Sequence, residues 1–147
     1  MSNATMQKFG YPNTLVAETA HWAVLVRPQQ VTLGSLVLVC REPVTAFGQV
    51  SEAAFTDLRT AVAGIETVLN GFVSYEKINH LMLMMVDPDV HFHVIPRYQG
   101  ARHFEGVEFP DAGWPGPPAL GSFIAPPPAV FDRIVQELRG RWNALNA

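Results

Sequence analysis

Apolar residues recur along the chain with two different spacings, one typical of strands and one typical of helices. Residues 22–26 and 36–40 are short apolar runs, and each is followed at once by an arginine and soon by a proline. The segment between them has no helical period. The pattern therefore predicts two antiparallel strands joined by a short loop.

Two longer segments have the three- and four-residue spacing of amphipathic helices. The first begins after Ser51, a good N-cap residue that is followed by Glu52, and Gly71 is its expected end. The second is predicted over 129–145, directly after three consecutive prolines, because proline suits the first helical turn. Its apolar face would carry Phe131, Ile134, Val135, Leu138, Trp142 and Leu145.

A second pair of strands is predicted between these helices. Residues 78–86 are mostly apolar, which is typical of a strand buried on both faces, and Asp87-Pro88 ends the run. The next strand alternates over 90–96. One of its faces carries Val90, Phe92 and Val94, and the other carries Asp89, His91, His93 and Ile95. We expect the two strands to form a hairpin at the centre of a sheet.

The order of these elements favours an α+β fold, with an antiparallel sheet, a long helix packed on it and a C-terminal helix. At 147 residues we expect a single domain, 1–147, with a core at about 12–100. Seven of the 12 prolines lie between Pro110 and Pro128, so a rigid, irregular Pro/Gly-rich loop is expected over 105–128.

Composition and charge exclude several function classes. The net charge of −3 argues against a general nucleic-acid binder, although it leaves room for a local basic pocket. The longest apolar runs fall short of the roughly 20 residues that a membrane span needs, and residues 1–11 lack a secretory core. Cys40 is the single cysteine, which fits a reducing cytoplasm. We therefore expect a cytoplasmic protein with neither membrane nor nucleic acid as a partner.

The candidate chemistry lies in Asp89, His91 and His93, whose Cα atoms would be spaced about 6.5–7 Å apart along one strand face. Two imidazoles and a carboxylate can converge on one small substrate, and histidine acts as nucleophile, acid or base. A structural role for the two histidines weighs about equally. A metal site using the same three residues is a further interpretation, although one cysteine makes structural zinc a poor fit.

The segment His91-Phe92-His93-Val94-Ile95-Pro96-Arg97 resembles the end of the histidine-triad (HIT) motif, in which histidines alternate with apolar residues before a Pro-Arg pair. Residues 77–81 (Lys-Ile-Asn-His-Leu) and 33–36 (Leu-Gly-Ser-Leu) also resemble bacterial members of that family. The resemblance covers about residues 12–100. It implies a HIT-like fold and a homodimer.

The resemblance also implies an enzyme, a nucleotide phosphohydrolase or phosphoramidase that needs no metal or cofactor. Its substrates would be dinucleoside polyphosphates, such as diadenosine polyphosphates, or nucleoside phosphoramidates. His91 occupies the position of the nucleophile that attacks the α-phosphorus and forms a nucleotidyl-histidine. His93 would contact the phosphate and assist the leaving group. Arg97 and Asn79 are candidates for substrate binding, with pairing to a carboxylate or a structural role as their alternatives.

Several positions depart from the family pattern, among them Arg41-Glu42-Pro43, where other members often carry a histidine. Asp89 replaces the first triad histidine, and its carboxylate would either orient an imidazole or repel a phosphate. Arg27, also a candidate for substrate binding, stands where many members carry an acidic residue for the ribose. Met84-Met85 stands where many carry an amide side chain. The alternative function is a non-catalytic nucleotide-binding HIT protein that has lost the full triad.

Overall fold

A central antiparallel sheet organises the molecule, which a computed structural model describes over residues 2–146. The strand order is β1-β2-β3-β5-β4. These strands are β1 (Leu15–Glu18), β2 (Trp22–Val26), β3 (Leu36–Cys40), β4 (Lys77–Leu81) and β5 (His91–Arg97). A separate hairpin comprises β6 (Ala101–Phe104) and β7 (Val107–Pro110). The helices are α1 (Ala4–Lys8), α2 (Glu52–Val73) and α3 (Pro128–Leu145), with a short 3₁₀ turn, η1 (Phe47–Gln49).

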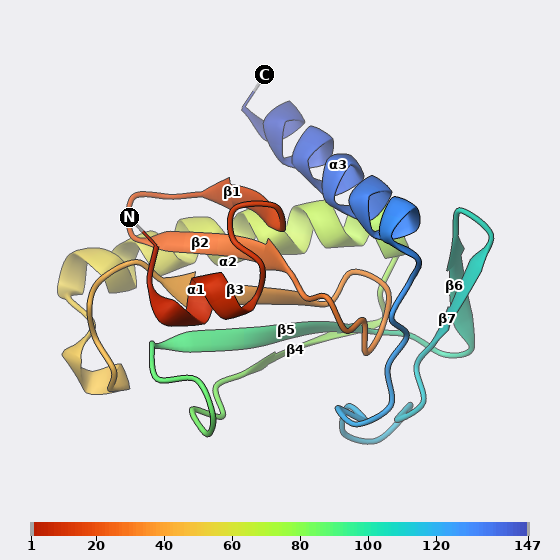
Figure 1. The fold of residues 1–147 in the computed structure, drawn as a ribbon, viewed down its shortest axis with the longest axis horizontal. Helices are drawn as coiled ribbons and strands as arrows, with labels where there is room; N and C mark the ends of the chain where they lie inside the picture. The colour runs from red at the N-terminus through yellow and green to blue at the C-terminus, as the bar shows by residue number, and fades with distance from the viewer. Residues whose placement is uncertain (1, 147) are drawn as a thin grey trace.

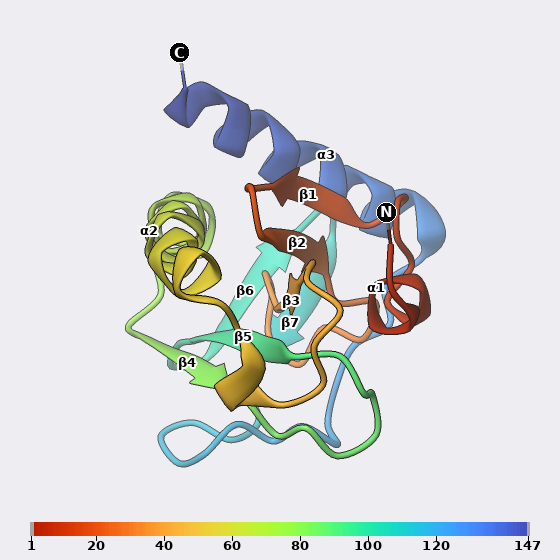
Figure 2. The ribbon, with the colours of Figure 1, turned by 90° about the vertical axis from the view of Figure 1, so that its left-hand side faces the viewer.

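Helices cover both faces of this sheet, α2 on one side and α1 on the other (Figure 2). Every residue of β2 and β3 is buried, because alternate side chains enter two separate cores. The larger core lies beneath α2 and contains Trp22 and Leu38. The smaller core lies beneath α1, where Met6 packs with Val37 and Val39. The predicted α+β fold and both early strands are confirmed.

The third layer is α3, which packs against β1 and α2 (Figure 1). It begins at Pro128, one residue before the predicted start, with proline in its first turn. Ile134, Val135 and Leu138 of the predicted apolar face are buried. Leu145 is exposed. Among residues 2–146, no helix combines the length and the apolar character that a membrane crossing requires.

The long helix α2 begins as predicted and ends later than predicted. Ser51 caps it, since its side-chain oxygen accepts a hydrogen bond from the Ala54 backbone N–H at 3.0 Å. Gly71 is not the end of the helix. The helix continues to Val73, which is buried against the core, and Ser74 takes the left-handed conformation that stops it. The burial of Val73 favours the extra half-turn.

The predicted strand 78–86 is wrong in length and position. The strand β4 ends at Leu81, and Met84 has a φ of 53°, which an extended strand cannot accommodate. Met85 and Val86 are then 84% and 82% exposed, rather than buried on both faces. The strand also lies at the edge of the sheet, because β5 pairs with both β3 and β4. Residues 82–90 form a nine-residue connection in place of the short turn expected.

The expectation of an irregular loop over 105–128 is wrong for its first part. Residues 107–110 form β7, which pairs with β6. Phe109 in this strand is fully buried, and its carbonyl accepts a hydrogen bond from the Tyr98 hydroxyl at 2.8 Å. This buried anchor holds the hairpin to the body of the fold. Residues 111–127 are the irregular, proline-rich part.

Gly64 of α2 faces the Trp142 ring of α3, so Gly64→Ala is expected to destabilise the protein. A Cβ at this position would lie 2.5 Å from the Trp142 ring. Overpacking of this kind costs about 1–3 kcal/mol of unfolding free energy. The matched control is Gly140→Ala on α3, where nothing lies within 4 Å and about 0.5–1 kcal/mol of stabilisation is expected. Urea unfolding measures both, and equal effects would contradict this packing.

Candidate functional site

The histidines of β5 lie side by side on the sheet face that α1 covers. In the register of β3 with β5, His91 is opposite Val39 and His93 is opposite Val37. Both valines belong to the smaller core. The two imidazole centroids are 5.2 Å apart with the rings near perpendicular, at 82°. His91 is only 2% exposed, and His93 is half-buried. The structure thus brings together the two imidazoles that the alternation placed on one face.

A single hydrogen bond fixes the tautomer of His91. Its Nδ1 lies 2.7 Å from the backbone carbonyl oxygen of Asp89. A carbonyl oxygen only accepts, so Nδ1 carries the hydrogen and donates it. The lone pair of the neutral ring is then on Nε2. This is the arrangement that a nucleophilic imidazole requires.

The carboxylate of Asp89 binds the N-terminal segment, and not an imidazole. Its Oδ2 accepts the Thr5 backbone N–H at 3.1 Å, and the Asp89 backbone N–H donates to Thr5 Oγ1 at 3.1 Å. The expectation that this carboxylate orients His91 or His93 is therefore corrected, because the Asp89 backbone carbonyl orients His91. Across residues 2–146, no group of three His, Cys, Asp or Glu side chains is arranged to hold a metal ion.

The N-terminal segment, residues 3–11, covers the histidines although it lies outside the predicted core of 12–100. Asn3 caps α1 and also donates from Nδ2 to the Cys40 carbonyl at 3.0 Å. The Phe9 ring centroid lies 6.3 Å from that of His91 and 6.0 Å from that of His93. The available sequence signal was Asn3 as an N-cap residue. A five-residue helix is too short to show an apolar period.

His93 is neutral at physiological pH. Burial, assisted by the nearby positive charge of Arg27, lowers the pKa of His93 to about 4. Its Nδ1 is buried and has no hydrogen-bond partner in the described chain. The ring is neutral and only partly buried. This ring is therefore suited to contacting a ligand next to His91.

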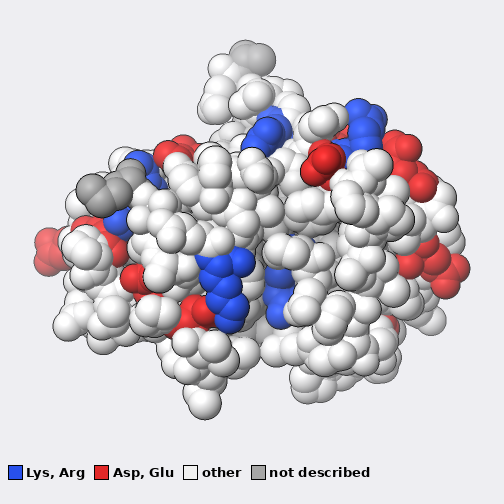
Figure 3. Space-filling view, viewed as in Figure 1, with Lys and Arg blue, Asp and Glu red and all other residues white. Residues whose placement is uncertain are grey.

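Arg27 lies directly after β2 and is half-buried beside this site. One guanidinium nitrogen, Nη1, donates to the Gln29 carbonyl at 2.8 Å. Burial lowers the pKa of Arg27, but an arginine stays charged at neutral pH. Arg27 lines a cavity of about 210 Å³ with Lys8, Phe9, Pro28 and Gln29. Figure 3 shows two basic areas that flank a hollow at the centre of this face, over α1 and the loop after β2.

Arg97 lies at the other end of β5, about 13 Å along the strand from His93. Asn79 lies on the neighbouring strand β4, opposite Ile95. Two nitrogens of Arg97 donate to the Asp111 carboxylate at 2.7 and 3.0 Å, and Nη1 donates to Asn79 Oδ1 at 2.8 Å. The Arg97 side chain is 4% exposed. Of the two roles predicted for Arg97, substrate binding and pairing with a carboxylate, the structure shows the pairing. Sequence reasoning missed Asp111, because nothing in an irregular loop marks such a partner.

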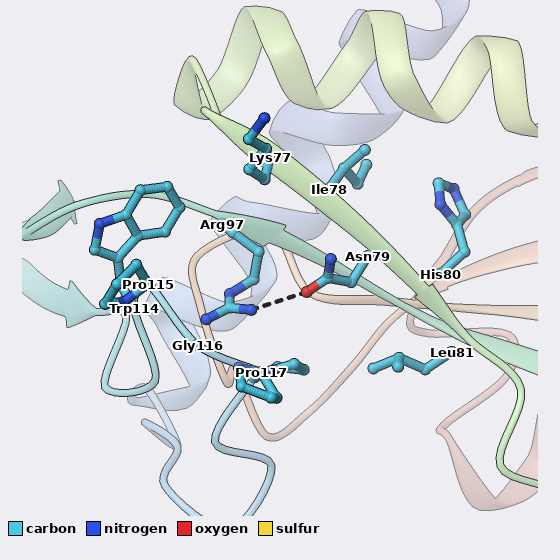
Figure 4. Close-up of a pocket in the computed structure, with 11 residues that line it drawn as sticks. Lys77, Ile78, Asn79, His80, Leu81, Arg97, Trp114, Pro115, Gly116 and Pro117 are labelled. Atoms are coloured by element: carbon cyan, nitrogen blue, oxygen red, sulfur yellow. Dashed lines mark hydrogen bonds between the residues drawn. The ribbon is translucent and has the colours of Figure 1, made fainter.

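The same two residues border a larger cavity of about 640 Å³ between β4 and residues 114–118. Trp114, Pro115 and Pro117 belong to the loop that faces β4 across the cavity (Figure 4). In the same view, Arg97 reaches toward Asn79 on β4. Asn79 thereby supports the Arg97 guanidinium. The structure does not bring Arg97 to the histidines, because its guanidinium is held by Asp111 in the proline-rich segment. Asn79 is opposite Ile95, on the sheet face of the histidines, and its side-chain oxygen is bonded to Arg97.

Solved structures of histidine-triad proteins share this fold. A histidine triad protein from Bradyrhizobium japonicum has a TM-score of 0.74 at 20% identity, over 96% of both chains. One from Marinobacter aquaeolei VT8 has a TM-score of 0.73 at 17% identity, over 99% of this chain and 97% of that one. A hypothetical histidine triad nucleotide-binding protein from Sulfolobus tokodaii strain7 has a TM-score of 0.67 at 17% identity, over 90% of this chain and 85% of that one.

These similarities confirm the HIT-like fold that the motif implied, and they show the fold alone. No family model matches the sequence. A comparison with curated proteins likewise finds no match.

Protonation of His93 is expected to make the protein less stable in acid. The folded pKa of about 4 is below the ordinary 6.5, so the unfolded chain takes up the proton first as the pH falls. His93 should therefore cost about 1–2 kcal/mol of stability between pH 7 and pH 4, a value reduced because the ring is partly exposed. Urea unfolding at several pH values should show this loss reduced in His93→Gln. His80, whose pKa burial also lowers, accounts for part of the remaining acid sensitivity.

The control is His103→Gln, since His103 is exposed on β6. It should keep the acid sensitivity of the wild type. An unchanged pH dependence in His93→Gln would contradict a neutral, half-buried His93.

Proposed function

We propose that the protein is a HIT-like nucleotide hydrolase or nucleotidyl transferase. It acts at the α-phosphate of dinucleoside polyphosphates or nucleoside phosphoramidates, through a covalent nucleotidyl-histidine. The observation that carries this proposal is the hydrogen bond from His91 Nδ1 to the Asp89 carbonyl, which leaves Nε2 with the lone pair. The histidine-triad fold and the second imidazole at 5.2 Å support it.

In the first step, His91 Nε2 attacks the α-phosphorus and forms a P–N bond while the bond from phosphorus to the leaving group breaks. The electron pair of the broken bond goes to the leaving group, which takes a proton from solvent. The imidazole becomes positively charged, and the Asp89 carbonyl, which accepts the Nδ1 hydrogen at 2.7 Å, stabilises that charge. In the second step, water attacks phosphorus and loses a proton to solvent, while the P–N bond breaks and its electron pair returns to Nε2, so that His91 leaves as a neutral ring.

His93 assists by holding the attacked phosphate, and Arg27 adds a positive charge beside it. The neutral His93 ring keeps one N–H, which it donates to a phosphate oxygen. Arg27 supplies a permanent positive charge close enough to lower the pKa of His93. Phosphoryl transfer depends mainly on positioning and charge stabilisation, which these two side chains supply. Asp89 acts through its backbone, and its carboxylate has no catalytic step.

Two observations favour the alternative, a non-catalytic nucleotide-binding protein. His91 is 2% exposed with Phe9 packed beside it, which restricts the access of a substrate to the ring. The side chain of Asp89, at the position of the first triad histidine, is hydrogen-bonded to Thr5 in the N-terminal segment and not to an imidazole. The experiment below separates the two functions.

We also propose that the protein is a homodimer joined at the free edge of β4. This strand pairs with β5 on one side only, which leaves backbone groups available for a second copy. Three exposed apolar residues, Leu83, Met85 and Val86, directly follow it. A two-fold pairing of the same edge on both copies is the simplest closed arrangement. A cytoplasmic location and the lack of a cofactor stay predictions from the sequence.

Hydrolysis of diadenosine tetraphosphate and of adenosine 5′-phosphoramidate tests the proposed reaction. The wild type should turn over at least one of them, and His91→Asn should lower kcat more than about 10³-fold because it removes the nucleophile. His103→Asn, an exposed histidine on β6, should retain the wild-type rate. AMP binding by calorimetry without turnover would establish the non-catalytic function. If the protein shows neither turnover nor AMP binding, both functions are contradicted.

Sedimentation velocity at micromolar concentration tests the dimer. We expect twice the chain mass of 16.2 kDa. A single species of the chain mass would contradict pairing through β4.

A further inference from the structure

The cavity beside His93 contains a cation without a counterion. Arg27 is half-buried, its Nε is fully buried without a partner, and within residues 2–146 no carboxylate forms an ion pair with it. Removing an arginine from water costs free energy that a protein normally recovers with a carboxylate, as Arg97 does with Asp111. Arg27 is half-buried, but no carboxylate of the described residues offsets the free energy lost when it leaves water. A ligand anion would supply it.

The other charges around the cavity strengthen its attraction for anions. Lys8 lines the cavity, and its Nζ is 2.9 Å from Asp87 Oδ1. His93 and His91 are the neighbouring imidazoles, and Nδ1 of His93 has no partner in the described chain. Asp87 is the acidic group in this set, so the two cations leave a surplus of one positive charge. Figure 3 shows the basic areas on both sides of the hollow.

We propose that this cavity binds a phosphate group of the substrate beyond the one attacked, and that Asp89 is a positioning residue that holds one wall of the cavity in place. The inference rests on the proposed function, because it uses His91 as the site of attack. A planar guanidinium and an ammonium together suit phosphate oxygens. The cavity is lined by Phe9, whose ring centroid lies 6.0 Å from that of His93, and its lining does not include His91, so a phosphate bound in it is a second one. The substrate class is therefore dinucleoside polyphosphates, in preference to phosphoramidates.

Asp89 acts on the cavity through the N-terminal segment. Lys8 and Phe9 form one wall, and both follow Thr5 in the same short helix and its end. Thr5 is held to Asp89 by two reciprocal hydrogen bonds of 3.1 Å. Losing them frees the wall that carries Lys8. This gives the aspartate at the first triad position a role in substrate selection.

Calorimetry with inorganic pyrophosphate tests the cavity without requiring turnover. The wild type should bind it, and Arg27→Gln should bind about tenfold more weakly or worse, as expected for loss of a charge-assisted contact. Arg59→Gln, on the exposed side of α2, should match the wild type. NMR titration should show the pKa of His93 rising when pyrophosphate binds. No binding, or equal binding by wild type and Arg27→Gln, would overturn the proposal.

Thr5→Val tests the positioning role of Asp89, and Thr67→Val at an exposed site on α2 is its control. Thr5→Val should weaken pyrophosphate binding while circular dichroism shows a folded protein. Unchanged binding would overturn the positioning role. If Thr5→Val fails to fold, Asp89→Ala replaces it, because it removes the carboxylate that accepts the Thr5 backbone N–H, and it must also weaken binding.

Kinetics separate a failure of this inference from a failure of the proposed function. Arg27→Gln should lower kcat/KM for diadenosine tetraphosphate at least about tenfold more than for adenosine 5′-phosphoramidate. An equal loss with both substrates would overturn the inference while the proposed reaction stands. Arg27-dependent pyrophosphate binding without any turnover would support the anion site and overturn the reaction.

Discussion

The pairing of β3 with β5 is the constraint on which the candidate site depends. Its register sets His91 opposite Val39 and His93 opposite Val37. Side chains of a strand alternate between faces, so a shift of one residue would turn both imidazoles into the core beneath α2. That core is lined by large apolar residues, including Trp22 and Leu38, which fix the register. The packing of the larger core therefore places the chemistry in the smaller one.

Asp89 links the site to the N-terminal segment because its backbone and its side chain have different partners. The carbonyl fixes the His91 ring, and the carboxylate holds Thr5 and the helix that follows. Both contacts are buried, where a lost partner leaves an unsatisfied polar group that costs about 1–3 kcal/mol. Asp89 thus links the tautomer of His91 to the position of α1, which covers the two histidines.

The sequence predicted those parts of the molecule that periodicity controls. The apolar runs that became β2 and β3, the helix after Ser51 and the shared face of His91 and His93 all follow from spacing alone. Met84 escaped prediction, because a positive φ in an apolar run leaves no compositional mark. Asp111 and the cover formed by α1 also escaped, since both depend on tertiary contacts between segments far apart in the chain. The role of Arg97 was open until its partner was known.

The central claim is that His91 attacks phosphorus, and mass spectrometry of a trapped reaction tests it most directly. The protein would be quenched in acid-free denaturant during turnover of diadenosine tetraphosphate and digested, and the peptide that contains His91 and His93 would be fragmented. The account predicts one adenylyl group on His91, absent from His91→Asn. Turnover with the group on His93, or with no adduct on the peptide, would contradict the account.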